Sequence, residues 1–398
     1  MKDVQSYMAD GDLRLTRQPP LSLYIHLPWC LKKCPYCDFN SHQLDTGADA
    51  AALQDRYIDA LFADLDASLP LVWERSVCSV FIGGGTPSLF APERIQRLIE
   101  GVRARLRLVP MCEITLEANP GTFERERFAA FRGAGVTRLS VGVQSFNDRH
   151  LKAIGRIHDG AQARAALEEA ARAFDTFNLD LMYALPRQTV AELVQDVHTA
   201  LSFAPPHLSI YHLTIEPNTV FAKFPPRLPD EDVAWDMLDR ITALTAEGGL
   251  SRYEVSAYAR TGHRCVHNLN YWQFGDYLGI GAGAHGKLSF AHRIVRQVRY
   301  RQPDSYMTHA LAGAAVAEEH ELGRADLPFE FMLNALRLKN GFNLDEYPEK
   351  TGLSVDTVEP QLREAERQGW IGRDGSWIQP TAHGFDFLND LQELFLPD

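Results

Sequence analysis

One stretch near the start of the chain decides how the rest is interpreted: it reads YIHLPWCLKKCPYCDF, from Tyr24 to Phe39. Within it, Cys30, Cys34 and Cys37 are spaced CxxxCxxC and follow an apolar run typical of a β-strand. Three thiolates can bind a [4Fe–4S] cluster and leave one iron open for a small molecule, to which the cluster delivers an electron. The stretch therefore predicts a metal site in a loop after the first strand, with these three cysteines as ligands.

A zinc site is the main alternative for the same three thiols. A structural zinc ion takes four protein ligands, usually from two separated pairs. The other cysteines, Cys78, Cys112 and Cys265, stand singly, so His26 or His42 would have to complete a zinc site. The spacing favours the iron–sulfur cluster.

The cysteine stretch resembles the signature of the radical S-adenosylmethionine (SAM) family, which has an aromatic residue, here Tyr36, before the last cysteine. The segments YIHLPWC and CPYCDFNSH resemble the sequences of one branch of that family. This branch contains oxygen-independent coproporphyrinogen III oxidase and the heme chaperones of the HemW family. The resemblance covers nearly the whole chain, and it implies that the open iron is chelated by the amino and carboxylate groups of SAM.

Composition places the chain among ordinary globular proteins. Its 398 residues suffice for one large α/β domain and a smaller one. With 40 Lys and Arg against 52 Asp and Glu, the net charge of −12 argues against nucleic acid as the main partner. The first twenty residues lack the apolar core of a signal peptide, and no run approaches the ~18 apolar residues of a membrane span. We therefore expect a cytoplasmic protein, whose clustered thiols stay reduced and bind metal.

Short apolar runs alternate with longer amphipathic segments, which predicts repeated βα units, a parallel sheet and an α/β fold. The expected strands are Leu21–Leu27, Val77–Ile82, Cys112–Ala118, Arg138–Gln144, Phe177–Ala184 and Leu208–Ile215, with Tyr253–Tyr258 as a candidate edge strand. The expected helices are Ala50–Ser68, Pro92–Leu106, Phe123–Gly133, Ala161–Phe174, Ala191–Phe203 and Asp230–Glu247. Six units predict a partial, open (β/α)6 barrel of TIM type, which the resemblance identifies as the radical SAM core.

The pattern changes near the end of the chain to short helices and a hairpin-like run, 370–378, with Asp374 and Gly375 at its turn. This predicts a small helical or winged-helix-type module. From residue 327 onward there are 6 basic against 13 acidic residues, so a lid or a docking surface for a partner protein is favoured over DNA binding. The expected units are an N-terminal tail, 1–20; a core barrel, 21–260; a barrel-closing segment, 261–302; and a C-terminal HemN/HemW-type domain, 303–398.

Unusual polar and glycine-rich residues follow the strand ends, where the site of a parallel αβ barrel lies. The resemblance implies that these residues bind SAM: the glycine loop meets its amino group, and an arginine pairs its carboxylate. The residues expected at the SAM site are Tyr24, Tyr36, Gly84, Gly85, Thr86, Glu117, Gln144, Arg156 and Asp180.

A later segment, His267-Asn-Leu-Asn-Tyr-Trp272, has the HNxxYW pattern that resembles the heme chaperones and is absent from the oxidase. An imidazole beside Tyr and Trp offers an axial iron ligand and a flat apolar surface, as heme requires. The candidates are Cys265, His267, Asn268, Tyr271 and Trp272, with His263 and His285 as weaker iron ligands. The alternative is that these residues pack together as an aromatic cluster that only stabilises the fold.

The oxidase carries a fourth cysteine two residues after the third, where this chain has Phe39, and a longer extension before the barrel. The resemblance therefore implies a heme chaperone that transfers heme to an acceptor protein and uses a [4Fe–4S] cluster with exchangeable SAM. Its expected partners are heme, a heme-accepting protein, with a membrane-associated acceptor as one candidate, and an electron donor for the cluster. The alternatives are oxidative decarboxylation of coproporphyrinogen III and another radical SAM reaction on a tetrapyrrole. Whether the chain is an enzyme is left open.

Overall fold

A large mixed sheet forms the body of the molecule in the computed structural model, which describes residues 4–9, 11–44, 47, 49–121 and 127–397. Six neighbouring strands run parallel, and most of their residues are buried because helices cover the sheet. They are β1 (Leu21–Leu27), β4 (Ser76–Gly84), β5 (Arg107–Ala118), β6 (Arg138–Gln144), β7 (Phe177–Tyr183) and β8 (His207–His212).

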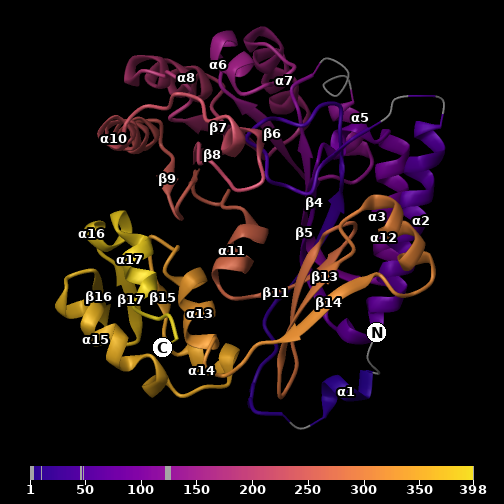
Figure 1. The fold of residues 1–398 in the computed structure, drawn as a ribbon, viewed down its shortest axis with the longest axis vertical. Coiled ribbons are helices and arrows are strands. Elements are labelled where there is room, and N and C mark those ends of the chain that lie inside the picture. The colour runs from indigo at the N-terminus through magenta and orange to yellow at the C-terminus, as the bar shows by residue number, and fades with distance from the viewer. Residues whose placement is uncertain (1–3, 10, 45–46, 48, 122–126, 398) are drawn as a thin grey trace.

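A helix follows each of these strands, which gives the six βα units expected from the sequence (Figure 1). The main helices are α2 (Ala50–Ser68), α3 (Pro92–Arg105), α5 (Phe128–Gly133), α7 (Gly160–Ala173), α8 (Val190–Ser202) and α10 (Glu231–Glu247), with the shorter α6 (Asp148–Ala153) after β6. Asp159 and Thr189 begin α7 and α8 with capping boxes. The expected start of α5 at Phe123 lies outside the described residues.

Short additional strands extend the sheet at both ends. On one side β11 (Asp276–Ile280) runs parallel to β1, and β12 (His285–Ser289), β13 (Ile294–Arg299) and β14 (Val316–Glu321) continue antiparallel. On the other side the range Tyr253–Tyr258 is no single strand: β10 (Ala257–Ala259) pairs antiparallel with β8, and β9 (Ser251–Arg252) pairs with β10. The order β14-β13-β12-β11-β1-β4-β5-β6-β7-β8-β10-β9 leaves the barrel open within the described residues, which confirms the expected fold class.

The expected sixth strand is too long, because β8 ends at His212 and not at Ile215. The three following residues form no ladder; Leu213 instead donates its N–H to the carbonyl of Tyr183 at 3.0 Å. The chain therefore leaves the sheet after this bond, at the point where the sequence suggests a continuing strand.

The end of the chain forms the small helical and winged module that the sequence predicts (Figure 1). Its strands β16 (Ile371–Asp374) and β17 (Trp377–Pro380) form a hairpin, in which Gly375 takes a φ of +59° that glycine tolerates. The remaining elements are β15 (Phe342–Asn343), α13 (Leu327–Ala335), α14 (Glu346–Thr351), α15 (Glu359–Arg367), α16 (Ala382–Asp386) and α17 (Leu388–Glu393).

Residues 303–321 pack with the large sheet. Helix α12 (Pro303–Leu311) lies against α2, where Tyr306 donates to Asp64 at 3.0 Å and Arg299 pairs with Asp64 at 3.2 Å. We propose that the C-terminal module begins near Leu322, and not at residue 303.

The N-terminal segment also packs on the body of the molecule. It contains α1 (Val4–Met8), and Tyr7 is 2% exposed and stacks on Phe290 at 5.1 Å between ring centroids. Leu15 donates its N–H to the carbonyl of Ala291 at 2.9 Å. This segment therefore covers the β12–β13 hairpin, although its sequence suggests a polar tail.

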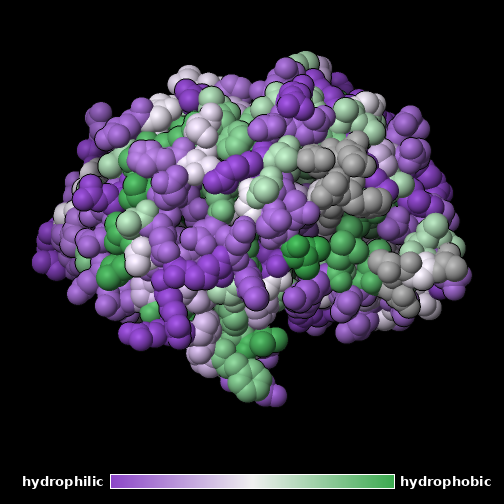
Figure 2. All heavy atoms as spheres, turned by 90° about the horizontal axis from the view of Figure 1, so that it is seen from above, coloured by the Kyte–Doolittle hydropathy of each residue, from purple (hydrophilic) through white to green (hydrophobic). Residues whose placement is uncertain are grey.

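Seen from above in Figure 2, the surface is largely hydrophilic, and its hydrophobic side chains lie in small groups. Among the described residues, none of the helices combines the length and the apolar character needed to cross a bilayer.

Candidate functional site

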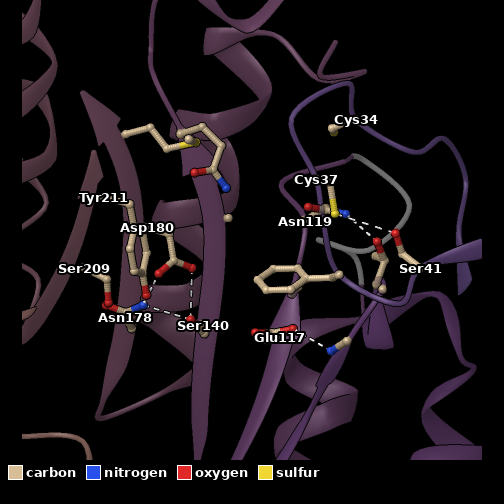
Figure 3. A pocket seen from close by; sticks show the side chains of 18 of the residues that line it. Cys34, Cys37, Ser41, Glu117, Asn119, Ser140, Asn178, Asp180, Ser209 and Tyr211 are labelled. Carbon is tan, nitrogen blue, oxygen red and sulfur yellow. Dashed lines mark hydrogen bonds between the residues drawn. The ribbon is translucent and has the colours of Figure 1, made fainter. Parts of the chain in front are cut away.

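The carboxyl ends of the parallel strands surround a cavity of about 520 Å³, here called the first cavity. Its walls come from the loop that holds the three cysteines, from the glycine loop after β4, and from the ends of β5 to β8 (Figure 3). Every residue expected at the cluster or SAM site lines it: Tyr24, Cys30, Cys34, Tyr36, Cys37, Gly84, Gly85, Thr86, Glu117, Gln144, Arg156 and Asp180. The topology therefore gathers residues from six strand ends into one place.

The cysteine loop, residues 28–41, is held by short-range backbone contacts. Strands β2 (Trp29–Cys30) and β3 (His42–Gln43) pair where the loop begins and ends, and Cys37 donates its N–H to the carbonyl of Cys34 at 3.2 Å. Each cysteine sulfur also lies near one polar side chain: Thr86 Oγ1 is 3.5 Å from Cys30, Ser41 Oγ is 3.7 Å from Cys37, and Arg156 Nη1 is 3.9 Å from Cys34. Three free thiols with hydrogen-bonding neighbours fit the ligand set of an iron–sulfur cluster.

The glycine loop fits tightly against the cysteine loop. A Cβ atom at Gly85 would lie 2.5 Å from the carbonyl oxygen of Trp29, so only glycine allows the two loops to approach. The N–H groups of the loop are used within the protein: Gly84 donates to Glu117 Oε2 at 3.0 Å, and Gly85 donates to the carbonyl of Leu27 at 2.8 Å. The loop can therefore offer a ligand its carbonyl oxygens, which suit an ammonium group.

Two carboxylates face the first cavity from β5 and β7, the strands on either side of β6 (Figure 3). Burial, and then the charge of Asp180, raise the pKa of Glu117 to about 7. Burial also raises the pKa of Asp180 to about 6, although Asn178 and Ser140 donate to it at 2.7 and 3.1 Å. These side chains make the cavity wall acidic at neutral pH, which favours a cationic ligand.

Arg156 brings a positive charge to the opposite part of the cavity. Its Nη2 donates to the carbonyl of Gly142 at 2.6 Å and to Asn119 Oδ1 at 2.5 Å, while its buried Nε has no acceptor among the described residues. A buried unpaired donor is unusual, and a ligand carboxylate would satisfy it. Gln144, at the end of β6, takes a φ of +69°, a strained conformation for a non-glycine residue and one often found at functional sites.

The HNxxYW segment forms α11 (Val266–Trp272), which lies between the sheet and the C-terminal module in Figure 1. Cys265, His267 and Asn268 line the first cavity. His267 is enclosed: Nδ1 lies 2.9 Å from Cys265 Sγ and 3.5 Å from Glu113 Oε1, and its ring lies 4.1 Å from that of Phe81. Glu113 lies behind this wall of the cavity, within reach of both Cys265 and His267.

Tyr271 and Trp272, at the other end of α11, line a second cavity of about 510 Å³. Tyr24, Asp38, Phe39 and Tyr271 line both cavities, which therefore share a wall. His285 also lines the second cavity, whereas His263 lines neither and lies 3.2 Å from Thr176 Oγ1. The structure thus divides the heme candidates between two neighbouring cavities.

Several polar residues of the first cavity are absent from the sequence-based set: Asn119, Arg138, Ser140, Asn178, His207, Ser209 and Tyr211. A period-two pattern could have found some of them, because Asn178 shares a strand face with Asp180. The same pattern places Glu113 on the face of β5 that carries Glu117, but its contact with α11 has no local signal because the two segments are far apart in the chain.

Family models match two parts of the chain: "Radical SAM superfamily" over residues 24–200 and "HemN C-terminal domain" over residues 322–387. The chain is 47% identical over 386 residues to a protein named "Heme chaperone HemW" from Escherichia coli (strain K12), which spans 96% of this chain and 100% of that one. It is 46% identical to the protein of the same name from Haemophilus influenzae over the same shares. A Bos taurus protein, "Radical S-adenosyl methionine domain-containing protein 1, mitochondrial", is 34% identical over 93% of this chain and 86% of its own length.

Among solved structures, coproporphyrinogen III oxidase (HemN) from Escherichia coli matches with a TM-score of 0.80. The match covers 95% of this chain and 90% of that chain, at 24% sequence identity. At this identity the likeness establishes the shared fold, including the barrel and the C-terminal module, while the function has to be argued from the site.

Proposed function

Because the chain belongs to the heme chaperone HemW family within the radical SAM superfamily, we propose that it binds heme and transfers it to a heme-accepting protein. The observation that carries this proposal is the similarity of 46–47% over the full length of two such chaperones. Such similarity extends through the core barrel, α11 and the C-terminal module, so it concerns the whole arrangement and not one motif.

We assign the [4Fe–4S] cluster to Cys30, Cys34 and Cys37. The fit of the cysteine loop supports this assignment, because the three sulfurs lie beside one cavity and each has a polar neighbour. When bound, such a cluster supplies an electron and an open coordination position. The chain itself shields this position with Tyr36 and Phe39, which line the same cavity.

We assign SAM to the rest of the first cavity. The sulfonium and ammonium groups of SAM are cationic, and Glu117 and Asp180 provide a negative wall for them. Arg156 would pair with the SAM carboxylate through its free Nε. Tyr24, Gln144 and the glycine loop complete the proposed site: Gly84, Gly85 and Thr86.

The oxidase reaction is not favoured as the function. The two families share a fold, but the position two residues after Cys37 holds Phe39, which is 63% exposed, where the oxidase has a fourth cysteine. A further radical SAM reaction on a tetrapyrrole finds no specific support in the described site.

We further propose a cytoplasmic location, a one-electron donor for the cluster and an acceptor protein that is membrane-associated. Free thiols in the cysteine loop suit a reducing compartment. The acidic C-terminal module, with 6 basic and 13 acidic residues from residue 327 onward, is the surface that we propose for the acceptor.

The test begins with anaerobic reconstitution and a heme titration followed by absorption spectroscopy. We expect saturable binding of one heme per chain and transfer of that heme to an apo-acceptor. Incubation with SAM, a reductant and coproporphyrinogen III should give no decarboxylated product. Absence of heme binding together with decarboxylation would replace the chaperone by the oxidase.

A matched set of variants tests the cluster ligands in the same preparation. Cys30→Ser, Cys34→Ser and Cys37→Ser should each lose most iron and acid-labile sulfide. Cys78→Ser is the control, because Cys78 lies outside both cavities and contacts Ser22 at 3.4 Å. Zinc in place of iron and sulfide in the wild type would overturn the cluster assignment.

A further inference from the structure

The second cavity has the chemistry of a site for a flat, anionic aromatic ligand. Its volume of about 510 Å³ is within the range of small-molecule sites. One wall consists of the aromatic rings of Tyr271, Trp272 and Tyr277, with Tyr271 and Tyr277 packed edge to face at 4.8 Å. The buried indole N–H of Trp272 has no acceptor among the described residues, which leaves a donor beside the cavity.

The floor of this cavity is a row of cross-strand neighbours on β11, β12 and β13. Lys287 lies opposite Tyr277 on one side and opposite Arg296 on the other. His285 is two residues before Lys287 and therefore projects from the same face of β12. Its imidazole is exposed and makes no hydrogen bond to a described residue, so a ring nitrogen is available to a ligand.

The two cavities differ in the charge of the residues that line them. The first is lined by three basic residues (Lys32, Arg138, Arg156) and four acidic ones (Asp38, Glu117, Asp180, Glu216), besides the three cysteines. The second is lined by three basic residues (Lys287, Arg296, Arg301) and one acidic one (Asp38). Heme carries two propionates, so its anionic edge fits the second cavity better.

The three basic residues of the second cavity differ in whether they already form an ion pair. Lys287 pairs with Asp276 at 3.0 Å, and Arg296 pairs with Glu330 while donating to Tyr277 Oη at 2.9 Å. Arg301 is exposed and forms no ion pair with a described residue. Its guanidinium can therefore bind a carboxylate without breaking an existing pair.

His267 is a poor iron ligand in this arrangement. It is 7% exposed, both ring nitrogens lie within 3.4 Å of Cys265 Sγ, and its ring packs on Phe81. A porphyrin needs open space around the ligating nitrogen, and here the sulfur of Cys265 lies close to both ring nitrogens. His267 instead anchors the start of α11, which places Tyr271 one turn further along.

We propose that heme binds in the second cavity, between α11 and the β11–β13 face, with His285 as the iron ligand and Arg301 as a propionate anchor. The proposal rests on the heme chaperone function and adds the place and the recognition chemistry of the cargo. On this assignment the HNxxYW segment contributes flat apolar surface through Tyr271 and Trp272, and His267 acts as a positioning residue.

The experiment compares heme titrations of reconstituted full-length wild type, His285→Ala, Arg301→Ala, Arg301→Lys and His267→Ala. His320→Ala is the control, because His320 is an exposed histidine of the same sheet outside both cavities. We expect His285→Ala to weaken binding about tenfold or more and to change the absorption and electron paramagnetic resonance spectra of the heme. Arg301→Ala should weaken binding by about tenfold, and Arg301→Lys by less.

Heme dimethyl ester, in which both propionates are uncharged, tests whether Arg301 acts by binding a propionate. It should bind the wild type more weakly than heme does, and Arg301→Ala should cause no further loss with the ester. An equal loss with heme and with its ester would overturn the role of Arg301.

The possible results distinguish failure of the proposed heme site from failure of the proposed chaperone function. Wild-type binding that His285→Ala and Arg301→Ala leave unchanged, but that His267→Ala abolishes, would overturn the proposed site and leave the chaperone function standing. Failure of the wild type to bind heme would overturn both. Cluster content and circular dichroism, measured on each variant, identify any variant that loses binding through misfolding.

Discussion

The guanidinium of Arg156 lies 3.9 Å from the sulfur of Cys34, and the same side chain donates to the carbonyl of Gly142 at 2.6 Å. Arg156 thereby joins the cysteine loop to β6, the strand that carries Gln144 at its end. A single side chain therefore contacts a proposed cluster ligand and borders the proposed SAM site.

Substitution of Arg156 by Lys keeps the charge and removes the planar fork. We expect cluster content close to wild type and SAM affinity lower by roughly tenfold, because the single nitrogen of Lys cannot replace both Nη2, which binds Gly142 and Asn119, and the separate Nε proposed for the carboxylate. Equilibrium binding of labelled SAM to reconstituted protein measures the change. Arg149→Lys, at an exposed position on α6, is the control, and equal affinity in both variants would refute the role of Arg156.

The pKa of Glu117 predicts that SAM binding depends on pH. Because burial and Asp180 raise this pKa to about 7, Glu117 binds a proton below pH 7 and loses the charge that attracts a cation. SAM affinity should fall roughly tenfold between pH 8 and pH 6 in the wild type. Glu117→Gln should bind SAM weakly with little pH dependence, whereas Glu216→Gln, at the same cavity, should keep the wild-type profile. A steep fall of SAM affinity with falling pH in Glu117→Gln would exclude Glu117 as the cause.

His207 predicts loss of stability in acid. It is buried between Asn178 Oδ1 at 2.7 Å and Tyr253 Oη at 2.9 Å, and burial lowers its pKa well below 6.5. The unfolded chain therefore binds a proton near pH 6.5 that the folded chain does not, so stability falls as pH falls below 6.5. Between pH 7.5 and pH 5.5 this histidine should cost about 1.4 kcal/mol.

Denaturant unfolding at both pH values checks this expectation. His207→Gln should be less stable at pH 7.5 but should lose less on acidification than the wild type, and the exposed His198→Gln should behave as wild type. An unchanged pH dependence in His207→Gln would mean that other groups, such as His158, whose pKa burial lowers to about 4, account for the acid sensitivity.

Local patterns were sufficient to predict the elements of the barrel. The helix Ala50–Ser68 and the strand Arg138–Gln144 have the bounds expected from the sequence, because apolar spacing and the flanking residues define both. The strands at the edges of the sheet were harder to predict from the sequence. Strands β11 to β14 do not continue the alternation of parallel strand and helix; only β11 pairs with β1, and the other three join the sheet through antiparallel pairing with one another.

The residues of the first cavity were predictable to the extent that they follow strand ends. Cys30 and Glu117 stand at such positions, so the topology brings them together. Asp180 lies in the middle of β7 and not past its end, and its side chain lines the cavity from within the strand. The second cavity was not predictable, because residues from α11, β11, β12 and β13 and from the cysteine loop meet there only in the folded chain. His285 and Arg301 carry no local pattern that marks them as neighbours of Trp272.

Asn40 gives the two cavities a common support. Its side-chain amide donates to the carbonyl oxygens of Ala282 and Arg301 at 2.9 and 2.8 Å, and its own carbonyl lies 2.9 Å from Nε2 of His26. The last turn of the cysteine loop is thus tied to the backbone beside the proposed heme anchor. A substitution at Asn40 would therefore disturb the backbone on both sides at once: the end of the cysteine loop, and residues 282 and 301 beside the second cavity.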